Sequence, residues 1–213
     1  KRVHLQEFAD VRPSGLVAMI LNEGDYLGWV KYSDGQRDVM LVTEQGQSIR
    51  FNESDVRVMG RKAGGVNAIK LSQDDCVAGM DVIQSHHTHI LVVTEFGFGK
   101  RTAIEGYSTQ GRYGLGVRTL ARNDRTGDIV AMRAINAKDE IMVITRVGVV
   151  LRTSIEGIRE TGRSTQGVTV MNINEGDAIA GLAIIRQDQS NNDQPEEVTE
   201  NGDEVTPALL IAV

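Results

Sequence analysis

The chain repeats a unit of 51 residues, and this period limits the folds that it can adopt. Three segments, VMLVTEQGQSIRF, ILVVTEFGFGKRT and IMVITRVGVVLRT, align without gaps. The recurring positions are Thr43, Thr94 and Thr145; Gly46, Gly97 and Gly148; and Arg50, Arg101 and Arg152. The same spacing relates Gly-Arg pairs that begin at Gly60, Gly111 and Gly162, and Gly-Val pairs that begin at Gly65, Gly116 and Gly167. Such a period is typical of arrays built from one small structural unit.

Each unit is predicted to form four short strands. In the first complete unit, the β-branched run over residues 39–43 is followed by a glycine turn and a second strand through Phe51. A third strand is expected over residues 65–71 and a fourth over residues 76–83. No segment shows the long 3.6-residue period of helical repeats. We therefore expect an all-β, propeller-like array of four-stranded antiparallel blades, with Val39, Leu41, Ile49, Phe51 and their equivalents in the core.

An incomplete unit precedes the complete ones, because RPSGLVAMILNEGDYLGWV resembles KAGGVNAIKLSQDDCVAGM and STQGVTVMNINEGDAIAGL. The predicted domain covers residues 1–187 as an incomplete ring. Its parts are a partial blade at residues 1–35 and blades at about residues 36–83, 84–135 and 136–187.

The acidic charge is concentrated in the last part of the chain. The net charge is −6, but seven acids and no Lys or Arg lie in residues 188–213, so residues 1–187 carry +1. We expect residues 188–213 to be a disordered acidic tail that competes with phosphate for nearby cations. Its apolar end, TPALLIAV, is either a strand that returns to the body or an added feature. The single cysteine, Cys76, and the absence of a long apolar run predict a cytoplasmic location.

Cations recur at two places in each unit. Arg50, Lys100, Arg101 and Arg152 follow the hairpin, with Ile49 or Leu151 expected to point inward beside them. A second set precedes or lies on the Gly-Val strand and contains Arg57, Arg61, Lys62, Arg112, Arg118 and Arg163. Equivalent positions of a disc lie on one ring, and a ring of guanidinium groups suits the phosphate backbone of duplex DNA without reading its sequence. Alternatively, these arginines satisfy loop carbonyls or pair with acids such as Glu53, Asp55, Glu105 and Glu156.

Other candidate sites are weak. His86 and His89 are separated by a metal-ligand spacing but have no Cys or carboxylate in register, so a solvated loop is the simpler interpretation. Tyr107 lies near cations, and we expect it to pack as a structural residue. No phosphate loop, acid-base pair or nucleophile triad is present, so we expect no catalytic residue, metal or cofactor in this chain.

The chain resembles the C-terminal DNA-wrapping domain of the DNA gyrase A protein. The resemblance is carried by QSIRFNESDVRVMGRKAGGVNAIKL, FGFGKRTAIEGYSTQGRYGLGVRTL and GVVLRTSIEGIRETGRSTQGVTVMNI. It implies a β-pinwheel with strand exchange between blades and duplex DNA bent around a basic rim. It also implies a parent ATP-dependent type II topoisomerase that introduces negative supercoils, with ATP and magnesium in the complex. The implied partners are DNA, the gyrase B protein and the N-terminal part of the gyrase A protein.

The resemblance has two departures. By register, the first two of the six blades that the family has are missing. The family's gyrase box, Gln-Arg-Arg-Gly-Gly-Lys-Gly, is replaced by a degenerate loop, which comprises Gln110, Gly111, Arg112, Tyr113, Gly114, Leu115 and Gly116. The related domain of topoisomerase IV and a protein-interaction scaffold with structural arginines therefore stay open as alternatives.

Overall fold

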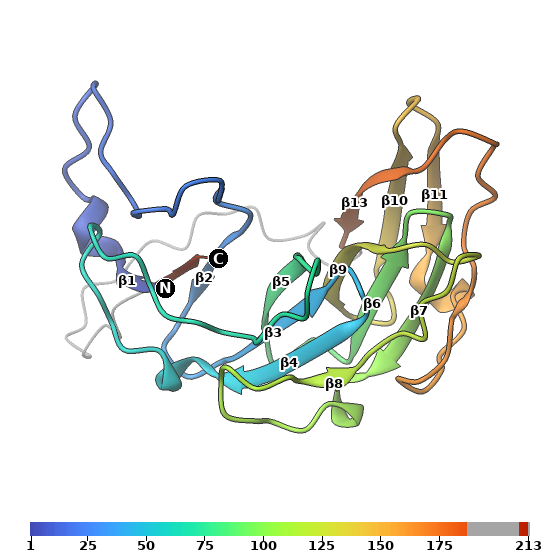
Figure 1. Cartoon of the computed structure of the whole chain (residues 1–213), viewed down its shortest axis with the longest axis horizontal. Coiled ribbons are helices and arrows are strands. Elements are labelled where there is room, and N and C mark those ends of the chain that lie inside the picture. Colours follow the sequence, from blue (N-terminus) through green and yellow to red (C-terminus); the bar gives the residue numbers. More distant parts are fainter. Residues whose placement is uncertain (187–208, 213) are drawn as a thin grey trace.

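The computed structural model describes residues 1–186 and 209–212, and these form an all-β array of blades arranged in an open arc (Figure 1). The first sheet contains β1 (Arg2–His4), β14 (Leu209–Ala212) and β2 (Val30–Ser33). The second contains β5 (Val77–Ile83), β3 (Asp38–Thr43), β4 (Gln47–Asn52) and β8 (Val117–Arg118). The third contains β9 (Ile129–Ile135), β6 (His89–Thr94), β7 (Phe98–Ala103) and β12 (Val168–Thr169). The fourth contains β13 (Ile179–Ile185), β10 (Glu140–Thr145) and β11 (Val150–Ser154).

Short 3-10 turns follow the outer strand of each blade. They are η1 (Leu5–Phe8), η2 (Glu53–Asp55), η3 (Ile104–Gly106) and η4 (Ile155–Gly157). Within the described residues, no helix has the length and apolar character needed to cross a membrane.

The hairpins form where the sequence predicts them, because each β-branched run ends at a glycine with positive φ. In the second sheet, β3 and β4 pair antiparallel from Asp38 opposite Asn52 to Val42 opposite Ser48. The turn between them contains Gly46 at φ 90°. This left-handed conformation strains most side chains, so the repeated glycine is a requirement of the backbone.

The fourth strand of a blade is supplied by the next unit. Val117 of β8 lies opposite Ser48 of β4, and Val168 of β12 lies opposite Gly99 of β7. Each of these Gly-Val strands therefore completes the preceding blade, as the resemblance implies. The predicted strand over residues 65–71 does not form, and a single bridge joins Ile69 to Gly114. No strand among the described residues pairs with Val66.

The core lies between neighbouring sheets, because strand side chains alternate between the two faces. Val39 and Leu41 pack with Ile49 and Phe51 on one face of the second sheet. Met40 and its neighbours pack against the third sheet through Ile90 and Met132. A third cluster joins the third and fourth sheets. The predicted core residues Val39, Leu41, Ile49 and Phe51 are all buried.

The end of the chain returns to the first unit. β14 pairs with β1 through Leu210 opposite Val3, and with β2 through Leu210 opposite Tyr32. It thus takes the middle position that β3, β6 and β10 hold in the other sheets. The returning strand is the first of the two interpretations of TPALLIAV. The remaining prediction of a disordered acidic tail falls on residues 187–208, which lie outside the described residues.

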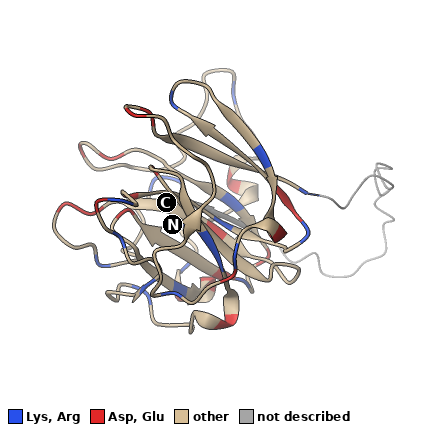
Figure 2. Cartoon of the chain, turned by 90° about the vertical axis from the view of Figure 1, so that its right-hand side faces the viewer, with Lys and Arg blue, Asp and Glu red and all other residues tan. Residues whose placement is uncertain are grey.

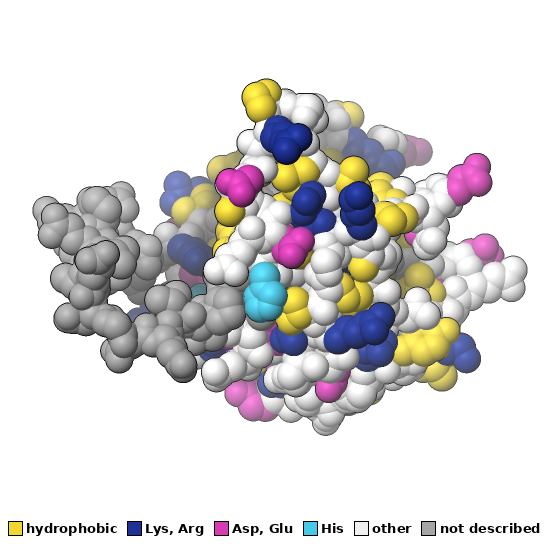
Figure 3. Space-filling model, turned by 90° about the vertical axis from the view of Figure 1, so that its left-hand side faces the viewer, with side chains coloured by type: hydrophobic (Ala, Val, Ile, Leu, Met, Phe, Trp, Pro, Cys, Tyr) yellow, Lys and Arg dark blue, Asp and Glu magenta, His cyan; other side chains and the backbone are white. Residues whose placement is uncertain are grey.

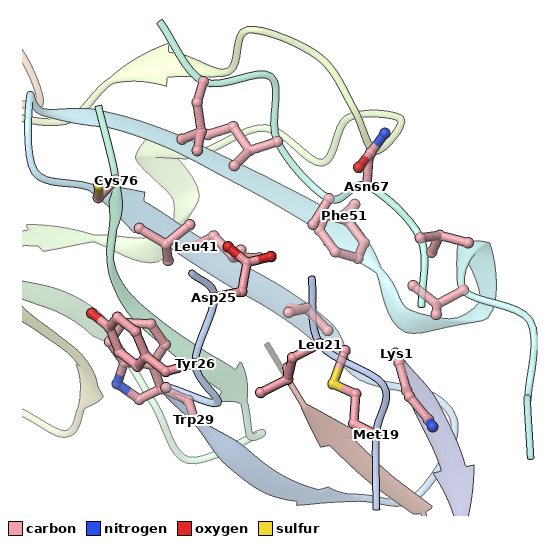
Figure 4. A pocket seen from close by; sticks show the side chains of 18 of the residues that line it. Lys1, Met19, Leu21, Asp25, Tyr26, Trp29, Leu41, Phe51, Asn67 and Cys76 are labelled. Carbon is pink, nitrogen blue, oxygen red and sulfur yellow. The ribbon is translucent and has the colours of Figure 1, made fainter. Parts of the chain in front are cut away.

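The first unit does not pack tightly against the second sheet. A cavity of about 440 Å³ lies between residues 19–29 and the second sheet. Figure 4 shows Met19, Tyr26 and Trp29 on one side of this cavity and Phe51 on the other. Its lining is mainly apolar, so it is not suited to a phosphate.

Candidate nucleic-acid interface

The arginines on the outer strands hold the next blade in place. Arg50 pairs with Asp38 at 2.8 Å (Nε to Oδ2). Its Nη1 also donates to the carbonyl oxygens of Ile104 and Tyr107, at 3.2 and 3.0 Å. These carbonyls belong to the turn at η3, which is part of the following unit. Arg50 is therefore engaged in a joint between blades.

Two equivalent arginines show how this joint depends on a following blade. Arg101 donates through Nε to the carbonyl of Ile158, 2.8 Å away, in the turn at η4. Arg152 lies on β11, where the described chain supplies no later blade, and it pairs there with Glu140. Its side chain is 61% exposed, compared with 20% for Arg50.

Lys100 lies in the interior. It takes the inward position that Ile49 holds one unit earlier, and its side chain is fully buried. Its Nζ donates to the carbonyls of Gly162, Arg163 and Thr165, at 2.8, 2.6 and 3.2 Å. Burial, with a smaller contribution from the charge of Arg163, lowers the pKa of Lys100 to about 8. In this conformation its ammonium group holds a loop of the next unit and does not reach the surface.

Lys1 also donates hydrogen bonds from a buried ammonium group to loop carbonyls, at an earlier joint between blades. Its Nζ donates to the carbonyls of Ala18, Arg61 and Ala63. The loop that contains Arg61 and Ala63 is the equivalent of the loop held by Lys100. A buried lysine thus secures a Gly-Arg loop at two joints of the array.

The arginines of the Gly-Arg pairs reach back to the preceding unit. Arg112 donates to the carbonyls of Asn67 and Asp55, at 2.7 and 3.1 Å. Arg163 donates to the carbonyl of Arg118 at 3.3 Å. Arg61 donates to the carbonyl of Val17 at 3.2 Å and lies 3.8 Å from Glu7. These side chains are half-buried, and they satisfy loop carbonyls as the alternative interpretation predicts.

Three equivalent loops, which we call the rim loops, cover residues 57–62, 108–113 and 159–164. Of the four predicted cations that are exposed, two lie in the first rim loop, and the other two are Arg118 and Arg152. Arg57 and Lys62 are exposed, and neither has an ion pair among the described residues. Arg118, on β8, is also exposed. Sequence reasoning missed the exposed Arg159. Its distance of 102 residues from Arg57, twice the repeat, was the signal that could have found it.

The rim loops carry mainly positive charge, and the turns just before them carry exposed carboxylates. They contain six cations, namely Arg57, Arg61, Lys62, Arg112, Arg159 and Arg163, and a single acid, Glu160. The turns just before them each expose one carboxylate, from Asp55, Glu105 and Glu156. Figure 2 shows Lys and Arg on strands as well as loops of the right-hand side, and Figure 3 shows them spaced among hydrophobic side chains on the left-hand side. Such a dispersed distribution fits an extended anion better than a compact one.

The degenerate box loop lies across the joint between the second and third sheets. Gln110 donates its N–H to the carbonyl of Arg50, and Tyr113 donates to that of Ala68. Gly114 accepts from Lys70, and Gly116 packs against Ser48, where a Cβ would lie 2.2 Å from the carbonyl oxygen. Gly111 and Leu115 are exposed, with Leu115 at 64%. The loop therefore connects blades and presents few groups to a ligand.

The other candidate residues have structural partners. The Nε2 of His89 lies 2.9 Å from Oε2 of Glu160, and His87 accepts from the backbone of Gln84. Tyr107 is buried, with its hydroxyl 2.6 Å from that of Thr119. The described residues contain no group of three or more His, Cys, Asp or Glu placed to hold a metal.

Comparison with known proteins decides the family. The model for the DNA gyrase C-terminal domain, a β-propeller, matches residues 37–84, 88–136 and 139–186. The chain belongs to the DNA gyrase C-terminal domain family. The matched ranges correspond to its three complete repeats, and the incomplete first unit lies outside them.

Relatives of this gyrase C-terminal domain are gyrase A proteins. The chain is 39% identical over 183 residues to the DNA gyrase A protein of Haloquadratum walsbyi, and the match covers 85% of this chain and 21% of that protein. It is 42% identical over 191 residues to the DNA gyrase A protein of Dehalogenimonas lykanthroporepellens, and the match covers 87% of this chain and 23% of that protein. The chain thus spans less than a quarter of the length of these relatives.

Solved structures confirm the fold of this gyrase C-terminal domain. The C-terminal domain of DNA topoisomerase IV aligns with a TM-score of 0.81 and 24% identity, over 85% of this chain and 57% of that chain. A DNA gyrase A C-terminal domain aligns with a TM-score of 0.73 and 23% identity, over 81% of this chain and 59% of that chain. The expected all-β array of antiparallel blades is confirmed.

Proposed function

We propose that this domain binds duplex DNA without sequence preference and bends it along the rim loops. The observation that carries the proposal is the presence of solvent-exposed cations along the array: Arg57 and Lys62 in the first rim loop, Arg118 on β8, and Arg159 in the third rim loop at the position equivalent to Arg57. Guanidinium and ammonium groups spaced along an arc can neutralise successive phosphates and release their counterions. Half-buried Arg61, Arg112 and Arg163 add positive potential from the same loops.

In the longer proteins that share this domain, bending would support the ATP-dependent introduction of negative supercoils by a gyrase. Its partners would be the gyrase B protein and the N-terminal part of the gyrase A protein, which would supply the ATP, magnesium and cleavage chemistry. The relatives named as DNA gyrase A proteins support this assignment. The structural similarity to topoisomerase IV keeps that enzyme as the second candidate parent.

The test is binding of a linear duplex at several salt concentrations. The variant Arg57→Gln/Lys62→Gln removes two rim cations, and Lys138→Gln/Arg146→Gln removes two exposed cations outside the rim loops. We expect the rim variant alone to bind more weakly, with the slope of log K against log salt reduced by about 0.9 for each lost contact. Equal effects from the two variants would contradict a role for the rim loops.

A scaffold function is the other candidate, and the carbonyl contacts of Arg50, Arg101 and Arg112 favour it. If it holds, the intact chain does not bind duplex DNA even at low salt, and replacing these arginines lowers only the stability of the fold. The same titration distinguishes the two functions.

The acidic segment is expected to weaken DNA binding. Deleting residues 188–213 would also remove β14, which completes the first sheet. Replacing the seven acids with their amides is therefore the cleaner test, and we expect tighter binding at low salt. Unchanged affinity would contradict competition by the segment.

A further inference from the structure

The middle rim loop, residues 108–113, differs from the other two in the side chains that it exposes. The first rim loop exposes Arg57 and Lys62, and the third exposes Arg159. The middle loop contains one cation, Arg112, which is half-buried and donates to carbonyls of the preceding unit. A duplex that follows the rim loops from the first to the third therefore passes a loop without an exposed cation.

Apolar side chains are exposed at this loop instead. Tyr113 is 52% exposed, and Leu115, two residues later, is 64% exposed. We call these two residues the apolar pair. The equivalent positions of the units on either side are also exposed, but they hold no apolar side chain: Lys62, Gly64, Ser164 and Gln166.

The backbone fixes the apolar pair in place. Tyr113 has a left-handed conformation, with φ 64°, which is strained for a large side chain. Its N–H donates to the carbonyl of Ala68 at 2.6 Å, and the carbonyl of Gly114 accepts from the N–H of Lys70 at 2.9 Å. Gly116 then packs closely against β4. Strain that the surrounding structure maintains is concentrated at ligand contacts and other functional sites, so an exposed aromatic residue here points to a binding role.

The exposure of the apolar pair does not depend on the ends of the array. The loop lies at the joint between the second and third sheets, where β8 is paired with β4. In Figure 1, β8 lies at the lower edge of the array, away from the first sheet and from β11. Within the described part of the chain, the pair is thus a surface feature of a joint whose two sheets are both present.

Cations flank the apolar pair in the sequence. Arg112 comes directly before it, and the exposed Arg118 follows Leu115 by three residues. A nucleic-acid backbone offers partners for both kinds of side chain, because its phosphate oxygens accept from guanidinium groups and its sugar rings present apolar carbons. The combination therefore favours duplex DNA over a protein as the ligand of this loop.

We propose that the apolar pair packs against the deoxyribose rings of bound duplex DNA between the first and third rim loops. This inference rests on the proposed function and adds a second kind of contact to it. The affinity that the pair supplies comes from buried apolar surface and not from released counterions. Every nucleotide carries the same sugar, so the contact does not read sequence.

The test is the salt titration of duplex binding with Tyr113→Ser/Leu115→Gln, which copies the side chains of the third unit. We expect the affinity to fall about tenfold at every salt concentration, with the slope of log K against log salt unchanged. Arg57→Gln/Lys62→Gln should instead reduce the slope. The matched control, Val147→Ser/Val149→Gln, makes similar changes at exposed valines outside the rim loops and should bind like the intact chain.

The outcomes separate this inference from the proposed function. If the intact chain binds and Tyr113→Ser/Leu115→Gln binds equally well, the inference is overturned and the proposed function stands. A reduced salt slope would also overturn it, because the pair would then act through the neighbouring arginines. If the intact chain does not bind duplex DNA even at low salt, the proposed function fails and this inference fails with it.

The variant Tyr113→Asn separates a binding role from a structural one. Asn tolerates the left-handed conformation better than Tyr, so thermal unfolding should occur at the same or a higher temperature. The affinity for duplex DNA should nevertheless fall. A variant that unfolds at a lower temperature, or that binds DNA as the intact chain does, would overturn the role of Tyr113 in binding.

Discussion

β7 and β11 have the same place in successive repeats, yet one is covered and the other is open. β7 contacts β12 of the next unit, and all but two of its six residues are buried. No residue of β11 is buried. The burial of an outer strand is therefore decided by the unit that follows it in the array.

The same dependence applies to the charged residues. Arg50 and Lys100 are engaged with carbonyls of a following unit, whereas Arg152 pairs with Glu140 of its own unit. An arginine of this repeat becomes structural when another blade follows. We therefore expect substitutions at equivalent positions to differ in their effects, most of all at the turn glycine, less at the strand arginine and least at Lys100.

The largest effect is expected at the repeated turn glycine. Gly97→Ala brings a Cβ against the carbonyl oxygen of Met171, and we expect a loss of about 4 kcal/mol or more in the free energy of unfolding. Gly148→Ala meets no described neighbour, so it should cost only the left-handed backbone, about 1–2 kcal/mol. Urea unfolding at low protein concentration measures both. Similar losses would mean that the two turns are equally open in solution.

A smaller effect is expected from the strand arginines. Arg50→Met removes the ion pair with Asp38 and the hydrogen bonds to the carbonyls of Ile104 and Tyr107, and it should cost about 3 kcal/mol. Arg152→Met removes an exposed ion pair and should cost less than about 1 kcal/mol. Thermal unfolding of the two variants checks this order. A larger loss of stability in Arg152→Met than in Arg50→Met would mean that contacts with the following blade are not the reason why Arg50 stabilises the fold.

The smallest effect concerns Lys100, whose replacement by Met removes the ammonium group that donates to the carbonyls of Gly162, Arg163 and Thr165. We expect a loss of about 2 kcal/mol at pH 7. Because the pKa of Lys100 is lowered to about 8 in the fold, the unfolded chain binds the extra proton between that pH and about 10.4. The stability of the wild type relative to Lys100→Met should therefore rise with pH in this window.

The exposed Lys62 provides the control for that experiment. Lys62→Met should leave the free energy of unfolding at pH 7 unchanged, because the side chain is exposed and has no ion pair among the described residues. A stability difference between wild type and Lys100→Met that stays flat from about pH 8 to about pH 10 would contradict the lowered pKa.

Much of the fold could be predicted from local pattern. The glycine at 46, 97 and 148 marks a turn, and the alternating run before it marks a buried strand, because backbone conformation and side-chain alternation are local properties. The prediction of a strand over residues 65–71 was wrong. A strand needs a partner in register, and the described chain offers none there.

The site was less predictable. The sequence placed Lys100 among the outward cations because Arg101 and Arg50 hold the neighbouring position of the repeat, but alternation turns its side chain inward. The side-chain donors of Arg112 and Arg163 are used by carbonyls more than forty residues away, which no local pattern reveals.

By itself, the sequence determined the repeat, the hairpins, the turn glycines and the positions at which cations recur, because each depends on residues close together in the chain. Only the tertiary structure decided which strand completes which blade and which cations stay open to solvent. Those outcomes depend on contacts between successive units, and each end of the described array lacks one neighbour. The same residue type therefore holds the following blade at Arg50 and is exposed to solvent at Arg152.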